Sequence, residues 1–451
     1  MARRARYGVV AITLSLALLF ESAAQAQTHE HHGAEAPAIA GRTGVLLADH
    51  GEPPEYNAWT YESFREFFQH LIAMGLIPRW LTMLETGTIA YDADCPACDT
   101  PSLSPRLIDA WLRPHPGPAV FVPANDSLPA HYVLPGGPGL GEPDIFEHVG
   151  LGSWHEWQRM GGRSPNYDEK LPRKRAVIRR LADAYGSRVP VRVGYMIDPR
   201  FGGKHHGVRE ALDELIKRDR VRSLVVVYHG VGFSDIMQTH HLRHTVSEHL
   251  KRLGADVSVR YAAPPGTTDH YVQAIVEKVR TELDRVPAEA PVAVHLSGHG
   301  LPTAMCGEYN CGADAYHRSS ADLFARVKRA LGKAITRKGR TGVFHLYGDG
   351  GEGDDDPDNK VDSPVEALDK RATAGFRYVV DVPYEFDANS RDTLIVLRQG
   401  YRRSAPDWNR TWESRFTYKG MVVKIANANG GHDHKVAALH AVTLAALRSA
   451  T

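Results

Sequence analysis

Short apolar runs bounded by turn residues recur along the chain and predict β-strands. Each is short and rich in apolar and β-branched residues, which is typical of a strand. The runs are residues 44–48, 189–197, 224–228, 257–262, 292–296, 342–346 and 377–382.

Helical periodicity separates these runs. Val272, Ile275, Val276, Val279 and Leu283 lie on one face of a predicted helix, as do apolar positions between residues 208 and 216. Alternation of strands and helices at this spacing predicts an α/β fold with doubly wound, mainly parallel sheets covered on both faces. The strand pattern restarts near residue 257, so we expect two Rossmann-like lobes, 42–254 and 255–451, with a cleft between them.

Three of the predicted strands end on the same dipeptide. His50-Gly51, His229-Gly230 and His299-Gly300 each follow an apolar run, and the first and third continue as His-Gly-x-Pro. In a doubly wound sheet the carboxyl ends of the strands form the ligand-binding edge. The pattern therefore predicts that the three histidines face one cleft.

The N-terminus has the features of a secretory signal peptide. A basic start is followed by a charge-free apolar stretch too short to span a membrane, and Ala24-Gln25-Ala26 is a small-residue cleavage site. We expect cleavage after Ala26, a histidine-containing segment at 27–41, and a soluble periplasmic protein without a membrane span. A retained anchor is the alternative.

Charge and composition narrow the class of partner. The chain has 54 Lys and Arg against 53 Asp and Glu, so no charge excess indicates nucleic acid or an anionic membrane. The 24 histidines are unusual, and clusters such as 240–244 and 432–434 suggest metal handling. Taken one by one, most clusters also fit solvated loops.

The segment His295–Pro302 resembles the histidine loop of the class II chelatases, which comprise ferrochelatases and the cobalt chelatases. Residues 189–196 with 208–215, 154–171 and 364–383 are similar, in order, to other ferrochelatase segments. The resemblance extends over roughly residues 42–445 and implies two Rossmann-like lobes around a tetrapyrrole cleft.

The resemblance assigns candidate residues position by position. His299 matches the family's active-site histidine, and Asp392 stands at the position of its acidic residue. Ser390 replaces a histidine found in many ferrochelatases. His50 and the pair His229 and Asp235 instead resemble positions of the cobalt and sirohydrochlorin chelatases.

Insertion of a divalent metal into a macrocycle releases two pyrrole protons. The site therefore needs a base and weak metal ligands, which neutral imidazole and a carboxylate supply. We expect His299 and Asp392 to be catalytic, and His299, Asp392, His50, His229 and Asp235 to bind metal. The alternative for His299 is a histidine whose nitrogens are satisfied by backbone groups at a strand end.

The four cysteines form two local pairs. In an oxidising compartment they predict two small disulfides, and a zinc or iron-sulfur site is the rival interpretation. The pairs are Cys95 with Cys98 and Cys306 with Cys311.

A glycine-rich acidic run spans residues 347–359. Asp354, Asp356 and Asp358 have the alternate spacing of a Ca²⁺ loop, but the EF-hand glycine and glutamate are missing. A solvated acidic loop is the favoured interpretation, and a secondary cation site is the alternative.

The sequence thus predicts a periplasmic chelatase that inserts Fe²⁺ or Co²⁺ into a porphyrin or sirohydrochlorin-type tetrapyrrole, without an organic cofactor. The alternative is a non-catalytic carrier or sensor of metal or haem on the same fold, which export favours because haem synthesis is normally cytoplasmic.

Overall fold

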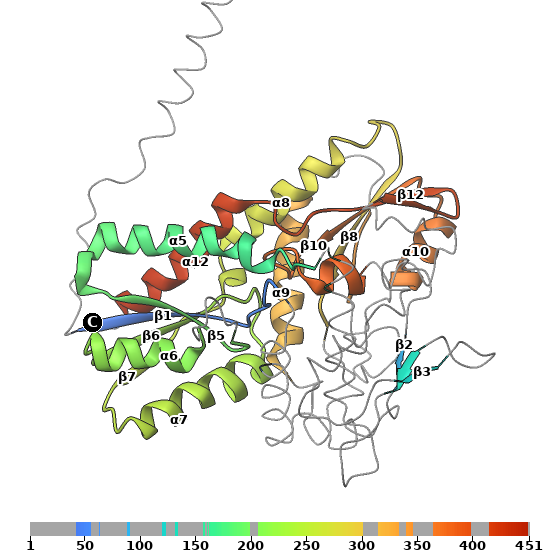
Figure 1. The fold of residues 1–451 in the computed structure, drawn as a ribbon. Helices are drawn as coiled ribbons and strands as arrows, with labels where there is room; N and C mark the ends of the chain where they lie inside the picture. Colours follow the sequence, from blue (N-terminus) through green and yellow to red (C-terminus); the bar gives the residue numbers. More distant parts are fainter. Residues whose placement is uncertain are drawn as a thin grey trace, which may run out of the picture. The chain divides into compact units, whose positions relative to one another are not determined.

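Two mainly parallel sheets and a small antiparallel sheet of three short strands lie in the described part of the protein (Figure 1). The computed structural model describes residues 42–55, 63, 88–90, 120–122, 131–133, 157, 160, 162–198, 206–300, 314–332, 340–345, 364–397 and 415–449.

The first sheet has the strand order β5-β1-β6-β7, and all of its strands are parallel. Its strands are β1 (Thr43–Asp49), β5 (Val191–Tyr195), β6 (Ser223–Tyr228) and β7 (Ser258–Tyr261). Side chains alternate between its faces. Val45 and Leu47 therefore pack against α5 (Asn166–Tyr185) and α12 (His432–Arg448), whereas Leu46 packs against α6 (Val208–Asp213) and α7 (His244–Arg252).

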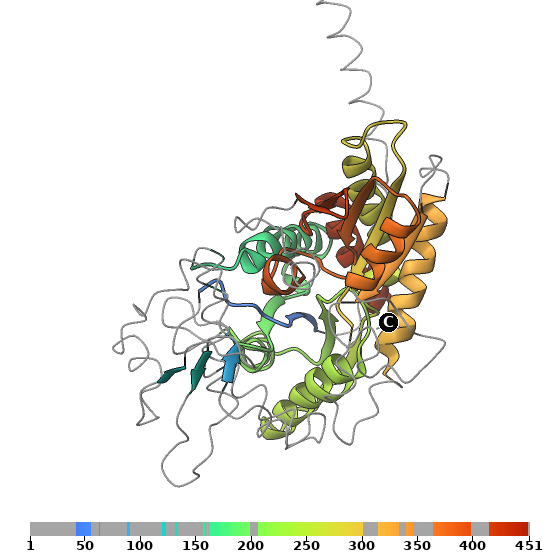
Figure 2. The ribbon, with the colours of Figure 1, turned by 90° about the vertical axis from the view of Figure 1, so that its right-hand side faces the viewer.

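The second sheet has the order β11-β12-β10-β8-β9, and only the edge strand β11 is antiparallel. Its strands are β8 (Val292–Gly298), β9 (Arg340–His345), β10 (Tyr378–Pro383), β11 (Arg415–Tyr418) and β12 (Met421–Ile425). Val294 packs with α8 (Asp269–Leu283) and α9 (Ala315–Leu331), whereas Ala293 packs with α10 (Pro364–Thr373). Figure 2 shows α9 running alongside this sheet.

Both sheets repeat one topology. From β1 the chain goes to β5 on one side and then to β6 on the other; from β8 it goes to β9 and then to β10 in the same way. Each sheet therefore has a switch point, between β1 and β6 and between β8 and β10, and crevices for ligands open at the carboxyl ends of strands there.

Shorter elements complete the described chain. They are the antiparallel strands β2 (Thr88–Ala90), β3 (Val120–Val122) and β4 (His131–Val133), the 3-10 helices η2 (Gly186–Arg188) and η5 (Pro265–Thr267), and the π-helices η3 (Glu214–Arg218), η4 (Asp235–Arg243) and η8 (Asp392–Val396). Among the described residues no helix is long and apolar enough to cross a membrane.

The structure confirms the predicted α/β class with doubly wound, mainly parallel sheets. Two features depart from a division at residues 254 and 255. Strand β7 lies beyond it yet pairs with β6, and α12 returns from the second sheet to cover the first. The hairpin of β11 and β12 was not predicted, because its alternating, partly exposed strands lack a long apolar run.

Candidate functional site

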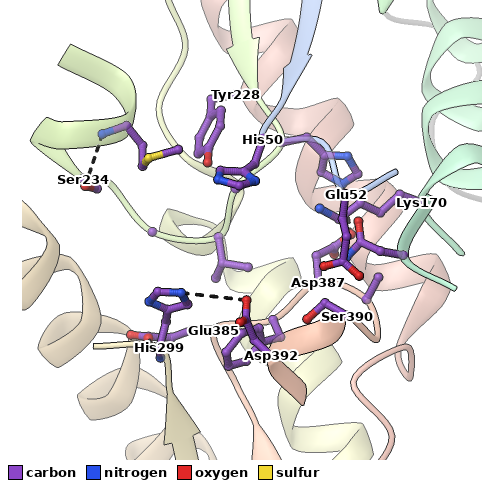
Figure 3. Close-up of a pocket in the computed structure, with 18 of the residues that line it drawn as sticks. His50, Glu52, Lys170, Tyr228, Ser234, His299, Glu385, Asp387, Ser390 and Asp392 are labelled. Atoms are coloured by element: carbon purple, nitrogen blue, oxygen red, sulfur yellow. Dashed lines mark hydrogen bonds and ion pairs between the residues drawn. The ribbon is translucent and has the colours of Figure 1, made fainter. Parts of the chain in front are cut away.

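A pocket of about 260 Å³ opens where the two switch points meet (Figure 3). His50 follows β1, His229 follows β6 and His299 follows β8, and all three line the pocket as the shared strand-end pattern predicts. The other lining residues include Glu52, Asn166, Lys170, Tyr228, Met237, Tyr316, Glu385, Phe386, Asp387, Ser390 and Asp392.

The turns His50-Gly51 and His299-Gly300 share a left-handed glycine and a hydrogen bond from the histidine ring. Gly51 and Gly300 have φ of 85° and 72°, a left-handed conformation that favours glycine. A Cβ at Gly51 would also lie 2.5 Å from the carbonyl oxygen of Ile197. In each turn the histidine Nδ1 donates to the carbonyl of the following glycine, at 3.3 Å in His50 and 2.7 Å in His299. Because a carbonyl only accepts, Nδ1 carries the proton and a neutral ring keeps a lone pair on Nε2.

His299 and Asp392 come together on one side of the pocket. The His299 Nε2 lies 3.9 Å from the Asp392 Oδ2, and the side chains are 39% and 22% exposed. Asp392 begins η8, and the guanidinium of Arg391 lies 3.5 Å from its Oδ1. Both groups are therefore accessible to a ligand that enters the pocket.

Glu385, which the sequence analysis did not select, supports the His299 turn. Its Oε2 accepts the backbone N–H of His299 at 2.7 Å and the hydroxyl of Tyr316. The Tyr316 oxygen in turn accepts the Gly300 N–H at 3.1 Å. Burial, and then the charge of Glu385, raise the pKa of Tyr316 well above its usual value, so the hydroxyl remains a donor. Glu385 lies two residues after Pro383, which ends β10. This position just after a strand was the only feature of the sequence that could have indicated Glu385 as a site residue.

Glu52 is the second carboxylate that the sequence analysis missed. It follows the His50-Gly51 turn, accepts the hydroxyl of Ser164, and accepts the backbone N–H of Arg391 from the other half of the chain at 2.9 Å. Burial, and then repulsion from Asp392, raise the pKa of Glu52 to about 7. Its place in the His-Gly-x-Pro phrase was the only hint of this position.

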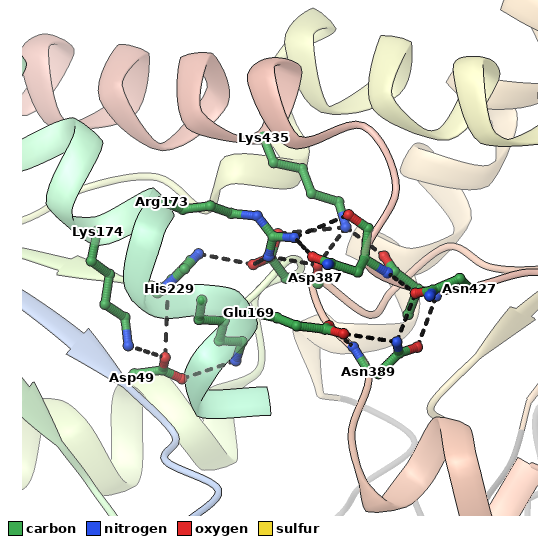
Figure 4. Close-up of polar contacts among 12 residues, drawn as sticks. Asp49, Glu169, Arg173, Lys174, His229, Asp387, Asn389, Asn427 and Lys435 are labelled. Atoms are coloured by element: carbon green, nitrogen blue, oxygen red, sulfur yellow. Dashed lines mark hydrogen bonds and ion pairs between the residues drawn. The ribbon is translucent and has the colours of Figure 1, made fainter. Parts of the chain in front are cut away.

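His229, which lines the pocket, lies between two carboxylates (Figure 4). Its Nε2 lies 3.1 Å from the Asp387 Oδ2 and its Nδ1 lies 3.7 Å from the Asp49 Oδ2, with only 4% of the side chain exposed. Burial lowers the pKa of His229, against the opposing effect of Asp387. Both ring nitrogens thus face acidic side chains, which favours a structural position over a metal ligand.

A buried polar network links β1 and α5 of the first sheet to the segment that follows β10 of the second sheet. Asp387 accepts from Arg173 at 2.6 Å, and Asp49 accepts from Lys174 at 2.5 Å. Burial alone would raise the pKa of Asp387, but Arg173 and then other cations outweigh it and lower the pKa well below its usual value. Asn389, which bonds Glu169 and Asn427, and Lys435, which bonds the carbonyl of Asp387, extend this network.

Asp235 does not line the pocket. Its Oδ2 accepts the backbone N–H of Ala315, and its Oδ1 accepts the Thr239 hydroxyl, each at 3.1 Å. Asp314 accepts the backbone N–H of Asp235 at 2.9 Å in return. The carboxylate therefore joins η4 to the start of α9.

Within the described ranges, no group of three or more His, Cys, Asp or Glu side chains is arranged to hold a metal ion. His299 and Asp392 are brought together as two candidate ligands. Several predicted residues lie outside the described ranges: Cys95, Cys98, Cys306, Cys311, Asp354, Asp356, Asp358 and the signal-like segment 1–26.

Comparison with known proteins identifies a ferrochelatase relative. The chain is 29% identical to the ferrochelatase of Picosynechococcus sp. over 184 residues, which are 40% of this chain and 44% of the relative. The chain thus matches less than half the length of that relative. No family model matches the sequence.

Two solved structures show weaker similarity. SirB from Bacillus subtilis with Fe³⁺ has a TM-score of 0.38 and 13% identity, and covers 62% of this chain and 88% of its own. The sirohydrochlorin chelatase SirB from B. subtilis subspecies spizizenii, in complex with cobalt, has a TM-score of 0.36, 11% identity and the same coverage. At these TM-scores the description of the fold rests on the strand order alone.

The sequence match confirms the predicted resemblance to the class II chelatases. The protein is similar in sequence to a ferrochelatase over about two-fifths of its length.

Proposed function

We propose that this protein is a tetrapyrrole metal chelatase that inserts Fe²⁺ or Co²⁺ into a porphyrin or sirohydrochlorin-type macrocycle. The observation that carries the proposal is the approach of the His299 Nε2 to the Asp392 Oδ2 at 3.9 Å in a solvent-accessible pocket. The relationship to a ferrochelatase supports it.

The geometry suits the chemistry of insertion. The Nε2 lone pair of His299 and the carboxylate of Asp392 offer one nitrogen and one oxygen to the incoming metal ion, and weak ligation by two groups permits its transfer to the macrocycle. As the ion passes to the macrocycle nitrogens both groups are freed, and they accept the two pyrrole protons and release them to solvent. Glu385 holds the backbone N–H of His299, and Tyr316 holds that of Gly300, while this occurs.

The test is a metal-insertion assay on the purified protein with porphyrin and with sirohydrochlorin, each supplied with Fe²⁺ or Co²⁺. We expect His299→Ala to lower kcat/KM about a hundredfold or more, because it removes the proton acceptor. Asp392→Asn keeps the shape and is expected to cause a smaller loss. The control His434→Ala, on α12 outside the pocket lining, should retain activity.

Turnover that is equal in wild type and His299→Ala contradicts this assignment. If the wild type binds metal or haem but inserts neither ion into either macrocycle, the protein is instead the carrier that the sequence left open.

We also propose that the protein acts in the periplasm, which the signal-like residues 1–26 support. Cell fractionation and the intact mass of the exported protein test this. A cytoplasmic protein that retains residues 1–26 contradicts it.

A further inference from the structure

The exposed side chains at the amino edge of the first sheet are mainly basic. This is the edge where its four parallel strands begin and where α5, η3 and α7 end. The helix α12 also ends there, because Leu447 packs with Tyr185 and Val189. The exposed cationic side chains at this edge are Arg42, Arg188, Arg218, Arg220, Arg222, Lys251, Arg252 and Arg448.

Backbone hydrogen bonds fix several of these residues side by side. The N–H of Arg222 donates to the carbonyl of Arg42 at 2.8 Å, and the N–H of Ser258 donates to the carbonyl of Arg222 at 3.1 Å. Arg42 precedes β1, Arg222 precedes β6 and Ser258 begins β7. Cations from separate parts of the chain therefore form one surface, which the sheet holds in place.

Carboxylates at this edge offset only part of the positive charge. Glu214 and Asp219 both pair with Arg192, each at 2.6 Å, and are therefore already engaged. Asp183 and Asp256 are exposed nearby. Within the described ranges, no ion pair is formed by the guanidinium groups of Arg42, Arg188, Arg220 and Arg222.

Arg220 occupies a position that favours glycine. Its φ of 53° is a left-handed conformation that residues with a side chain rarely adopt. The side chain is exposed, so burial does not offset the conformational cost. A long cationic side chain at such a position fits a role in binding.

The basic edge and the pocket lie at opposite ends of the strands. His50 and His229 follow the carboxyl ends of β1 and β6, whereas Arg42 and Arg222 precede the same strands. Six residues of parallel strand span about 20 Å. A large partner bound at the basic edge therefore leaves the pocket open.

The chain enters the fold at this edge. Arg42 is the first described residue, and Thr43 begins β1. The sequence before it contains the basic start and the apolar stretch 7–20, which are typical of membrane targeting. A chain targeted in this way meets phospholipid headgroups, which favours lipid over other polyanions as the partner.

We propose that the amino edge of the first sheet is a docking surface for an anionic phospholipid membrane. Guanidinium groups suit phosphate because they donate two parallel hydrogen bonds to it. An extended array of phosphates matches cations spread over several strand starts, whereas one small anion would contact few of them. The net charge of +1 did not predict this partner, because carboxylates elsewhere balance the arginines.

The experiment is cosedimentation of the full chain with vesicles of phosphatidylcholine, or of an equal mixture of phosphatidylcholine and phosphatidylglycerol. We expect stronger binding to the anionic vesicles, and loss of this excess as salt rises, because salt screens surface charges. Binding through the apolar stretch 7–20 appears with both vesicles, so the difference between them reports charge.

A triple variant with Arg42→Gln, Arg220→Gln and Arg222→Gln tests the surface itself. Each cation near an anionic membrane contributes about a fivefold gain in binding, so the variant should bind the anionic vesicles about a hundredfold more weakly. The control combines Arg175→Gln, Arg209→Gln and Arg329→Gln. It removes the same charge from exposed positions on α5, α6 and α9 and should bind like wild type.

A single variant separates binding from folding. Arg220→Gly suits the left-handed backbone, so it should keep the thermal unfolding midpoint and still weaken binding to the anionic vesicles about fivefold.

Each outcome decides the inference. Equal losses in the two triple variants, or no preference of the wild type for anionic vesicles, would overturn the docking surface. If the edge variant loses binding to soluble polyphosphate but not to vesicles, the partner is a soluble polyanion and the membrane proposal is wrong. The assay contains neither metal nor macrocycle, so none of these results bears on the proposed chelatase function.

Discussion

The histidine turns at the two switch points, His50-Gly51 and His299-Gly300, have similar backbone conformations but differ in the charged side chains around them. Each has a histidine at a strand end, a left-handed glycine and an Nδ1 bonded to the glycine carbonyl. His50, however, follows Asp49, whose carboxylate pairs with Lys170 and Lys174, whereas the carboxylates Glu385 and Asp392 accompany His299.

Because of this difference in charged neighbours, His50 and His299 are expected to differ in how well they bind a cation. Burial, and then the charge of Lys170, lower the pKa of His50. A cation attracted into the pocket is repelled by Lys170 and attracted by Asp392. The His299 side therefore suits a metal ion better than the His50 side does. Charges supplied by other elements, and not the His-Gly phrase, distinguish the two sides.

The largest effect on this comparison should come from Asp387→Ala. Asp387 accepts from Arg173 and approaches His229, both from the first half of the chain, and it is 5% exposed. Loss of one partner from a buried ion pair costs about 3–5 kcal/mol, because the remaining charge is left unpaired. Urea unfolding measures this change. Asp322→Ala, at a 65% exposed carboxylate, should change the free energy of unfolding by less than about 1 kcal/mol. If both variants lose the same free energy of unfolding, the buried network around Asp387 does not stabilise the contact between the two sheets.

Glu52 provides a pH-dependent test. Its pKa is raised from 4.5 to about 7, so the folded state binds more protons than the unfolded state between these values. The free energy of unfolding should therefore fall as pH rises from about 4.5 to about 7, by about 1.4 kcal/mol per unit of pKa shift. Thermal unfolding of Glu52→Gln, which cannot ionise, should lack this component. If wild type and Glu52→Gln show the same pH dependence over that interval, Glu52 does not titrate as described.

The smallest effect is expected from His50→Ala. Because His50 lies beside Lys170, it should contribute less to metal transfer than His299, and we expect about a tenfold loss in kcat/KM against a hundredfold or greater loss for His299→Ala. The insertion assay with Fe²⁺ and Co²⁺ measures both variants. A loss in His50→Ala as large as that in His299→Ala would show that the two sides act equally on the metal.

Local features predicted much of the fold. Short runs rich in apolar and β-branched residues correctly located β1, β5, β6, β7, β8, β9 and β10, since such residues favour strands through local preference. The His-Gly phrases placed three histidines at strand ends, and parallel strands brought them to one pocket. The return of α12 to the first sheet and the β11-β12 hairpin had no comparable local signal.

By itself the sequence determined the α/β class, the strand positions, the glycine turns and the pairing of His299 with Asp392 through a family resemblance. Only the tertiary structure decided that Glu52 and Glu385 join the pocket, that Asp235 does not, and that His229 lies between two carboxylates. The physical reason is range. A strand or turn depends on neighbouring residues, whereas Asp49 meets Lys174 across 125 positions when α5 packs on the first sheet, and Arg173 meets Asp387 across 214 positions when the two sheets pack together.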